Sequence, residues 1–411
     1  MASLKKNIFY SGMLTTANYL FPLITYPYVS RVLGVDNIGI CNFVDSIIHY
    51  FLILSTLGIG TVGIREIAKN KGNQAELEKA FSKLFTINTI TTTIAIIILI
   101  IAIYTVPQLY ENCKLMWIGV LKLLFNYLLI EWLYKGLEDF KYITNRTIVV
   151  RFIYVACVFL FVKSENDVLL YYFLLTAMII VNAFINVIYA RKYVKLNLCF
   201  RGLGQYSKSI GYLGVYNILT SMYTTFNVAY LGFVAGNVEV GYYTTSTKIH
   251  SIILMMFTAV TGVLMPRMAV ILSKRKYNEY VNLIKKSLII LFVFSLPAIS
   301  FIELFSPTII QLIAGTGYEG AITPLRIIAP LILIIGLEQI LITQSLMPMG
   351  KDKAILFNSV LGASVGLIMN IILVPYWASI GSAIVWVISE ISVMLSAMFF
   401  FRRAWIELKK Q

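Results

Sequence analysis

Asp45 and His49 are the residues whose types and spacing first suggest chemistry, because they stand four apart in a stretch that is otherwise mostly apolar. On a helix, residues four apart lie on one face, so the two side chains can hydrogen-bond to each other. An imidazole titrates near neutral pH, and a carboxylate binds either a proton or a sodium ion. We expect the pair to be a cation-coupling site; the alternatives are a mutually satisfied pair with a packing role and a position of Asp45 near the outer interface.

Cationic side chains also interrupt the apolar runs of the sequence. Lys122 and Asn126 share one helical face, and Lys248 lies about two turns inside a later run. A fixed cation attracts an anion far more strongly among apolar groups than in water. We therefore expect these side chains to line an anion-binding cavity. Three arginines outside the middles of the runs are secondary candidates for this role: Arg31, Arg151 and Arg326. For the last two, contact with lipid headgroups is the alternative.

Two glutamates lie near the middles of apolar runs in the second half of the chain. Glu338 and Glu390 have no basic residue nearby in sequence, whereas Gln339 and Gln344 are close to the first of them. A carboxylate in an apolar environment is costly, so each needs a bound cation, a proton or a polar partner. We expect a second cation-coupling site here, and protonated carboxyls satisfied by neighbouring helices are the alternative.

The sequence has no arrangement typical of an enzyme active site. HExxH and phosphate-cradling glycine-rich motifs are missing. The cysteines are far apart and lack metal-ligand spacing, which argues against a zinc site and a disulfide framework: Cys41, Cys113, Cys157 and Cys199. We expect no enzymatic activity, no metal site and no bound cofactor other than a coupling proton or sodium ion.

The elements that must position these residues are membrane helices. Apolar residues make up 59% of the 411 residues and charged residues 13%, and the mean hydropathy is +0.82. Soluble domains do not approach this balance. An α-helix needs roughly 20 apolar residues to cross a hydrocarbon core of about 30 Å. About twelve continuous runs therefore predict an all-α integral membrane protein: 7–29, 38–61, 84–106, 115–135, 147–163, 168–190, 213–235, 241–266, 287–305, 324–347, 354–375 and 379–401.

The basic residues predict how the chain lies in the membrane. A net charge of +15 is compatible with nucleic-acid binding, but most of the Lys and Arg residues fall in segments on one side of the predicted helices. Positive loops stay in the cytoplasm, so both termini are expected there, and we expect no nucleic-acid partner. The outer loops hold three basic residues, Arg31, Lys114 and Lys163, whereas one of the inner loops is expected to hold Lys135, Lys141 and Arg146.

The two halves of the chain repeat one pattern. "GVDNIG" begins at Gly34 and "GNVEVG" at Gly236, and Arg65 and Arg267 follow them at the same offset of 202 residues. A constant offset near half the chain length indicates an internal duplication. Six helices are an even number, so the copies are parallel repeats. We expect an N-lobe of residues 1–202 with helices 1–6 and a C-lobe of residues 203–411 with helices 7–12.

Several segments resemble one transporter superfamily. "SRVLGVDNIG", "GIREIA", "EWLYKGLEDFKYI" and "NIILVPYWASIGSAIVWVISE" are similar to the polysaccharide-transport branch of the multidrug/oligosaccharidyl-lipid/polysaccharide exporter superfamily, which contains the Wzx-type flippases of O-antigen and capsule repeat units. The resemblance covers nearly the whole chain. It implies two six-helix lobes in a V around a central cavity, a bacterial inner membrane and a substrate of undecaprenyl pyrophosphate bearing a short glycan.

These observations together predict a flippase. We expect it to move undecaprenyl-pyrophosphate-linked oligosaccharide from the cytoplasmic to the outer leaflet by alternating access coupled to a cation gradient, for the synthesis of O-antigen or another surface polysaccharide. The expected partners are the lipid-linked oligosaccharide, the bilayer and polysaccharide assembly proteins, and the expected state is a monomer. A drug/cation antiporter of the same superfamily is the alternative. An anionic pyrophosphate needs a positive cavity lining, whereas a cationic drug needs an acidic one.

Overall fold

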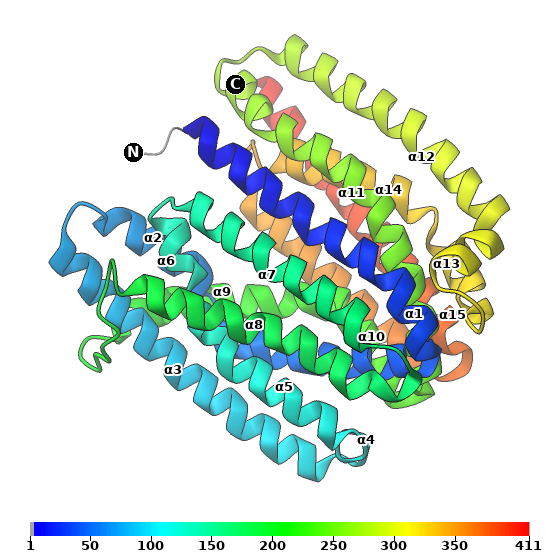
Figure 1. Ribbon diagram of the computed structural model, residues 1–411. Coiled ribbons are helices and arrows are strands. Elements are labelled where there is room, and N and C mark those ends of the chain that lie inside the picture. Colours follow the sequence, from blue (N-terminus) through cyan, green and yellow to red (C-terminus); the bar gives the residue numbers. More distant parts are fainter. Residues whose placement is uncertain (1–3, 411) are drawn as a thin grey trace. The chain divides into compact units, whose positions relative to one another are not determined.

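The polypeptide is helical along nearly all of its length. The computed structural model describes residues 4–410, and no β-strand occurs within them (Figure 1). The chain forms two compact units, Met1–Ile218 and Leu219–Gln411. The prediction of an all-α architecture is therefore confirmed.

The first unit consists of long helices that are broken at a few points. Their bounds are α1 (Leu4–Thr56), α2 (Ile59–Asn70), α3 (Gln74–Thr105), α4 (Pro107–Glu111), α5 (Cys113–Asn126), the 3₁₀ turn η1 (Tyr127–Leu129), α6 (Glu131–Gly136), α7 (Phe140–Phe161), the 3₁₀ turn η2 (Glu165–Asp167) and α8 (Val168–Ala190). An extended linker leads to α9 (Gly204–Thr224), which crosses the boundary between the units. Helix α1 packs against α3, α5 and α7, and α5 packs against α8.

The second unit has the same character. Its helices are α10 (Phe226–Ala235), α11 (Asn237–Ser273), α12 (Tyr277–Ile313), the 3₁₀ turn η3 (Glu319–Ala321), α13 (Ile322–Ile328), α14 (Leu331–Leu341), the π-helical turn η4 (Ile342–Leu346) and α15 (Asp352–Lys410). Helix α15 packs against α10, α13 and α14, and α11 packs against α12.

Large apolar side chains on the outer surfaces indicate contact with lipid. On α12, for example, Val293, Leu304 and Leu312 are each at least 70% exposed. Such surfaces are unfavourable in water but match a hydrocarbon solvent. Within the described residues, eight helical segments are long and apolar enough to cross a membrane, and two of these, Phe9–Asn70 and Asp352–Leu408, each contain two of the predicted runs. The protein is therefore a multi-pass membrane protein.

The two units share a backbone feature at the repeated glycines. Gly34 has φ 76° and ψ 170°, and Gly236 has φ 85° and ψ −179°. This region of φ and ψ is open essentially to glycine alone. The residue three positions after each glycine then contacts the chain at or next to the connection between the last two predicted runs of its unit: Asn37 Nδ2 donates to Glu165 O at 3.0 Å, and Glu239 Oε2 accepts from Ser379 N at 3.1 Å. The two units thus share a glycine conformation and a side-chain-to-backbone contact at matching positions.

Candidate functional site

The first unit joins two of the predicted site residues. Lys122 on α5 forms an ion pair with Asp45 on α1. Tyr172 on α8, which is fully buried, donates its hydroxyl to the same carboxylate oxygen at 3.2 Å. The side chain of Lys122 is 14% exposed and that of Asp45 is 45% exposed, so the pair is open on the acid's side. Three helices distant in sequence thus converge on one carboxylate.

His49 and Asn126, which the sequence grouped with Asp45 and Lys122, lie on the same helices as those two residues. His49 is exposed on α1, one turn after Asp45, while the hydrogen bonds of that carboxylate go to Lys122 and Tyr172. Asn126 is the last residue of α5, one turn after Lys122, and it lines a pocket. The carboxylate that the sequence paired with an imidazole is thus paired with an amine from another helix.

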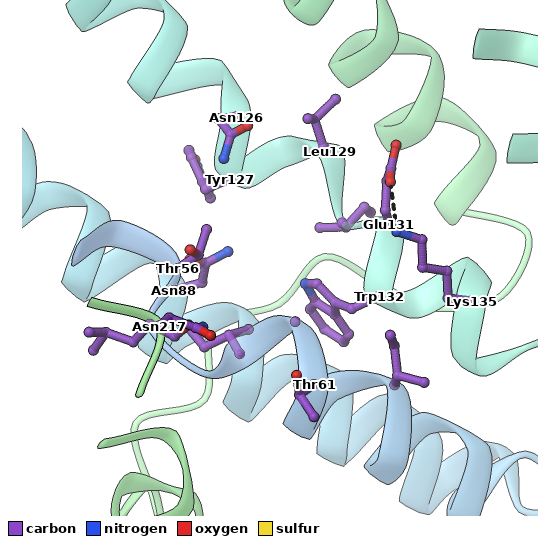
Figure 2. A pocket seen from close by; sticks show the side chains of 15 residues that line it. Thr56, Thr61, Asn88, Asn126, Tyr127, Leu129, Glu131, Trp132, Lys135 and Asn217 are labelled. Atoms are coloured by element: carbon purple, nitrogen blue, oxygen red, sulfur yellow. Dashed lines mark hydrogen bonds and ion pairs between the residues drawn. The ribbon is translucent and has the colours of Figure 1, made fainter. Parts of the chain in front are cut away.

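The pocket next to Asn126 lies where two helices are broken (Figure 2). Its volume is about 290 Å³. The break between α1 and α2 occurs at Leu57, with φ 43°, and the break between η1 and α6 at Ile130, with φ 36°. Left-handed φ values are strained for such side chains, and a β-branched one is a clear outlier. Irregular backbone at membrane depth is tolerated where it is buried or lines a cavity, so these breaks mark the pocket as a built feature.

Asparagine side chains satisfy the backbone at both breaks. Asn217 Nδ2 donates to Leu57 O at 2.8 Å, and Asn186 Nδ2 donates to Leu129 O. Helix ends leave carbonyls without partners, and an unpaired buried carbonyl is costly. The two amides therefore stabilise the open backbone around the pocket.

Glu131 connects the pocket to a buried network of polar groups. Its Oε2 lies 3.1 Å from Lys135 Nζ, the pair drawn with a dashed line in Figure 2, and its Oε1 accepts from Arg146 Nη2 at 2.8 Å. Arg146 is 7% exposed and also donates to Asn186 Oδ1 and, at 3.0 Å, to Thr147 Oγ1. The sequence assigned Arg146 to an inner loop, but α7 begins at Phe140, so this arginine is a buried helical residue.

The remaining predicted cations lie apart from this pair. Arg151 Nη1 donates to Ala17 O at 2.8 Å, and Arg326, which is exposed, donates through Nε to Ser306 Oγ at 2.7 Å. Both guanidinium groups therefore hold helices together. Arg31 is exposed on α1 and Lys248 is half-buried on α11. Their proposed contacts with an anion stay predictions.

The second unit brings Glu338 and Glu390 together. Both side chains are buried, on α14 and α15, and their carboxyl groups are close enough to interact electrostatically. Trp386 Nε1 also donates to Glu390 Oε1 at 2.9 Å. Two buried carboxylates that lie near each other repel when both are charged, so a proton on one of them is favoured. This contact favours the protonated alternative at this site.

Spacing in the sequence does not single out four residues that lie near these sites. Tyr172, Arg146 and Trp132 belong to apolar or loop-like stretches, and a buried role was not visible from spacing. His250 is fully buried and packs edge to face against Trp386, with ring centroids 5.2 Å apart, and neither ring nitrogen has a hydrogen-bond partner. It is one of only two histidines in the chain, so its residue type alone was enough to mark it as a candidate.

Known proteins with similar folds are membrane transporters. The fold matches the lipid II flippase MurJ with a TM-score of 0.76, covering 98% of this chain and 90% of the other at 14% identity. It matches an inward-facing MATE family multidrug transporter with a TM-score of 0.70, covering 95% and 94% at 14% identity. At such low identity the likeness concerns the fold, and it agrees with the superfamily that the sequence motifs indicated.

Sequence relatives identify the family. The chain is 26% identical over 407 residues to the "Putative O-antigen transporter" of Escherichia coli (strain K12), covering 97% of each chain, and 26% identical over 401 residues to the protein of the same name from Shigella dysenteriae, covering 95% of this chain and 98% of the other. Both relatives are named as transporters, which agrees with the expectation that the chain is not an enzyme. Residues 4–272 match the family described as "Polysaccharide biosynthesis protein", and the chain belongs to that family.

Proposed function

We propose that this protein is a flippase that carries undecaprenyl-pyrophosphate-linked oligosaccharide from the cytoplasmic to the outer leaflet of a bacterial inner membrane. The family match, the names of the relatives and the fold support a transporter of lipid-linked polysaccharide. The grouping of basic residues in the predicted inner segments supports cytoplasmic termini. The observation that carries the proposal is the ion pair between Lys122 and Asp45, which holds an amine among the helices of the first unit; we propose that this amine binds the pyrophosphate.

The same ion pair suggests how substrate movement is coupled to a cation gradient. The amine of Lys122 is neutralised by Asp45, so it binds a phosphate well only when the carboxylate is released. A proton or sodium ion on Asp45 weakens its hold on the lysine and frees the amine. A lysine suits this exchange, because its flexible stem lets a point charge follow a moving phosphate.

The carboxyl pair of the second unit is the proposed companion site. Glu338 and Glu390 are both buried and near each other, and we propose that a proton is lost and regained there as access changes. In this proposal the coupling cation exchanges at Asp45, where it also controls the amine of Lys122, and at the glutamate pair of the second unit. Lys248 remains the proposed anion-binding cation of the second unit.

The acids of the first unit argue against the alternative of a cationic drug. In the first unit, Asp45 is paired with Lys122, and Glu131 is paired with both Arg146 and Lys135. Neither acid therefore presents an uncompensated negative charge to a cation. An antiporter of cationic drugs needs such charges in its binding site.

Leaflet-specific detection of the substrate tests the proposal. Deleting the gene should leave lipid-linked oligosaccharide in the cytoplasmic leaflet and reduce the surface polysaccharide of the strain. Full-length protein in liposomes should expose reconstituted undecaprenyl-pyrophosphate oligosaccharide to an external lectin, and Lys122→Gln should slow this more than Lys122→Arg. Surface polysaccharide that is unchanged by the deletion, together with no flipping in liposomes, would contradict the assignment.

A further inference from the structure

The pocket at the two helix breaks contains hydrogen-bonding groups that the protein leaves unused. Trp132 Nε1 and Asn88 Oδ1 are buried at its wall and have no hydrogen-bond partner. The residues themselves are 6% and 2% exposed. An unpaired buried polar atom typically costs about 1 to 3 kcal/mol. In Figure 2 the indole nitrogen of Trp132 is on the side of the ring that faces the open space.

Packing fixes the Trp132 donor in place. Its ring stacks on Phe81, with centroids 5.3 Å apart, and a Cβ added at Gly63 would come within 2.6 Å of it. The indole therefore cannot turn to find another partner within the protein. A donor held rigidly toward a cavity is preorganised for a ligand, because little conformational entropy remains to be lost on binding.

The pocket offers many donors and acceptors but little net charge. Amides and hydroxyls dominate its polar lining, which includes Thr56, Thr61, Asn88, Asn126, Tyr127 and Asn217. Its one acid, Glu131, and its one base, Lys135, form an ion pair with each other. Such a lining does not favour a phosphate or a cation. It suits a neutral ligand whose groups both donate and accept hydrogen bonds, and sugar hydroxyls do this.

We propose that this pocket binds one sugar ring of the glycan. Trp132 Nε1 donates to a sugar oxygen, Asn88 Oδ1 and the Glu131 carboxylate accept from hydroxyls, and Tyr127 forms the aromatic part of the wall. The volume of about 290 Å³ is near the lower limit of small-molecule sites, which begin at about 300 Å³, so it suits a single ring. The inference rests on the proposed flippase function and assigns the glycan, rather than the pyrophosphate, to this pocket.

Fluorine NMR of the full-length protein tests the pocket directly. The tryptophans of the detergent-solubilised chain are replaced by 5-fluorotryptophan, and the Trp132 resonance is identified as the one lost in Trp132→Phe. Methyl glycosides of hexoses and N-acetylhexosamines, and the lipid-free repeat oligosaccharide, are then titrated. We expect at least one of them to shift the Trp132 resonance in a saturable way, and Asn88→Leu to weaken that binding roughly 2- to 10-fold.

Two controls separate this site from other causes. The Trp117 resonance, identified in the same way with Trp117→Phe, should not move, because that side chain is 42% exposed and lies outside the pocket. Inorganic pyrophosphate at the same concentration should leave the Trp132 resonance unchanged. A Trp132 resonance that no saccharide moves, or that pyrophosphate moves equally, would overturn the sugar site. Saccharide binding in a protein that flips no lipid-linked oligosaccharide would support the site and reject the proposed function, whereas flipping without saccharide binding would do the reverse.

Discussion

At the scale of single residues, the ion pair between Lys122 and Asp45 contributes to the stability of the first unit. Either partner alone would be an uncompensated charge, and removing one partner of a buried pair typically costs about 3 to 5 kcal/mol. The Asp45 side chain is 45% exposed, which reduces the penalty through solvent screening. The pair therefore lies between the buried and the surface extremes.

We expect Asp45→Asn and Lys122→Gln each to lower the free energy of unfolding by about 1 to 3 kcal/mol. The double variant should lose less free energy of unfolding than the two single variants lose together, because no unpaired charge then remains. Denaturation of the purified protein in detergent measures all three variants. Strictly additive losses would mean that the two side chains do not interact in the folded protein.

Replacing Arg146 is predicted to destabilise the protein more than replacing Arg65. Its side chain is 4% exposed and contacts Glu131, Asn186 and Thr147. Arg146→Met should destabilise the protein by about 3 kcal/mol or more, because buried polar partners are left behind. Arg65→Met is the matched control, since Arg65 is 61% exposed and its pair with Glu66 should be worth less than about 1 kcal/mol. Equal shifts in melting temperature for both variants would contradict a structural role for Arg146.

At the scale of elements, the two repeated glycines determine where each unit bends its chain. Gly34→Ala and Gly236→Ala should each cost about 1 to 3 kcal/mol, because alanine is strained at φ 76° and φ 85°. Space is not the reason: nothing lies within 4 Å of a Cβ at Gly236, and the nearest atom at Gly34 is 3.8 Å away. Gly12→Ala, within helix α1, is the control and should be neutral or stabilising by up to about 1 kcal/mol. Equal changes in melting temperature for all three variants would contradict this expectation.

Breaks within helices also explain which of the predicted apolar runs match the observed helices. The run 168–190 coincides with α8, because one uninterrupted apolar segment forms one helix. The run 115–135 is split into α5, η1 and α6, and nothing between Asn126 and Glu131 is a glycine or a proline. The break there depends on Asn186, which donates to the Leu129 carbonyl from another helix. A local pattern cannot contain that contact.

At the scale of the whole molecule, the distribution of positive charge predicts the orientation, and native cysteines report on it. Cys113 begins α5 after a predicted outer loop, and Cys199 lies in the basic linker after α8, which is predicted to be cytoplasmic. Neither is in a disulfide, and both are half-buried. A membrane-impermeant maleimide should label Cys113 in intact spheroplasts. It should label Cys199 only after the membrane has been permeabilised.

Serine variants assign the labelled positions in that experiment. Cys113→Ser should abolish labelling in intact spheroplasts, and Cys199→Ser should remove the signal that permeabilisation adds. Labelling of Cys199 from outside would place the basic linker on the outer face and would reject the predicted topology.

The sequence by itself determined that the protein is surrounded by lipid and that its fold is all-α. It also determined which charged residues lie unfavourably within apolar runs. Mean hydropathy, charge asymmetry and a repeat at one offset depend on composition and order, and a bilayer imposes helices on any long apolar run. Asp45, Lys122, Glu338 and Glu390 were recognisable because a charge in an apolar run needs a partner. Only the tertiary structure decided which partner each one has. Lys122 meets Asp45 across 77 residues of sequence, and Trp132 faces a cavity only because Gly63 and Phe81 hold it there. Partner choice depends on how separate helices pack, and helical periodicity specifies the face of a residue but not the helix opposite it.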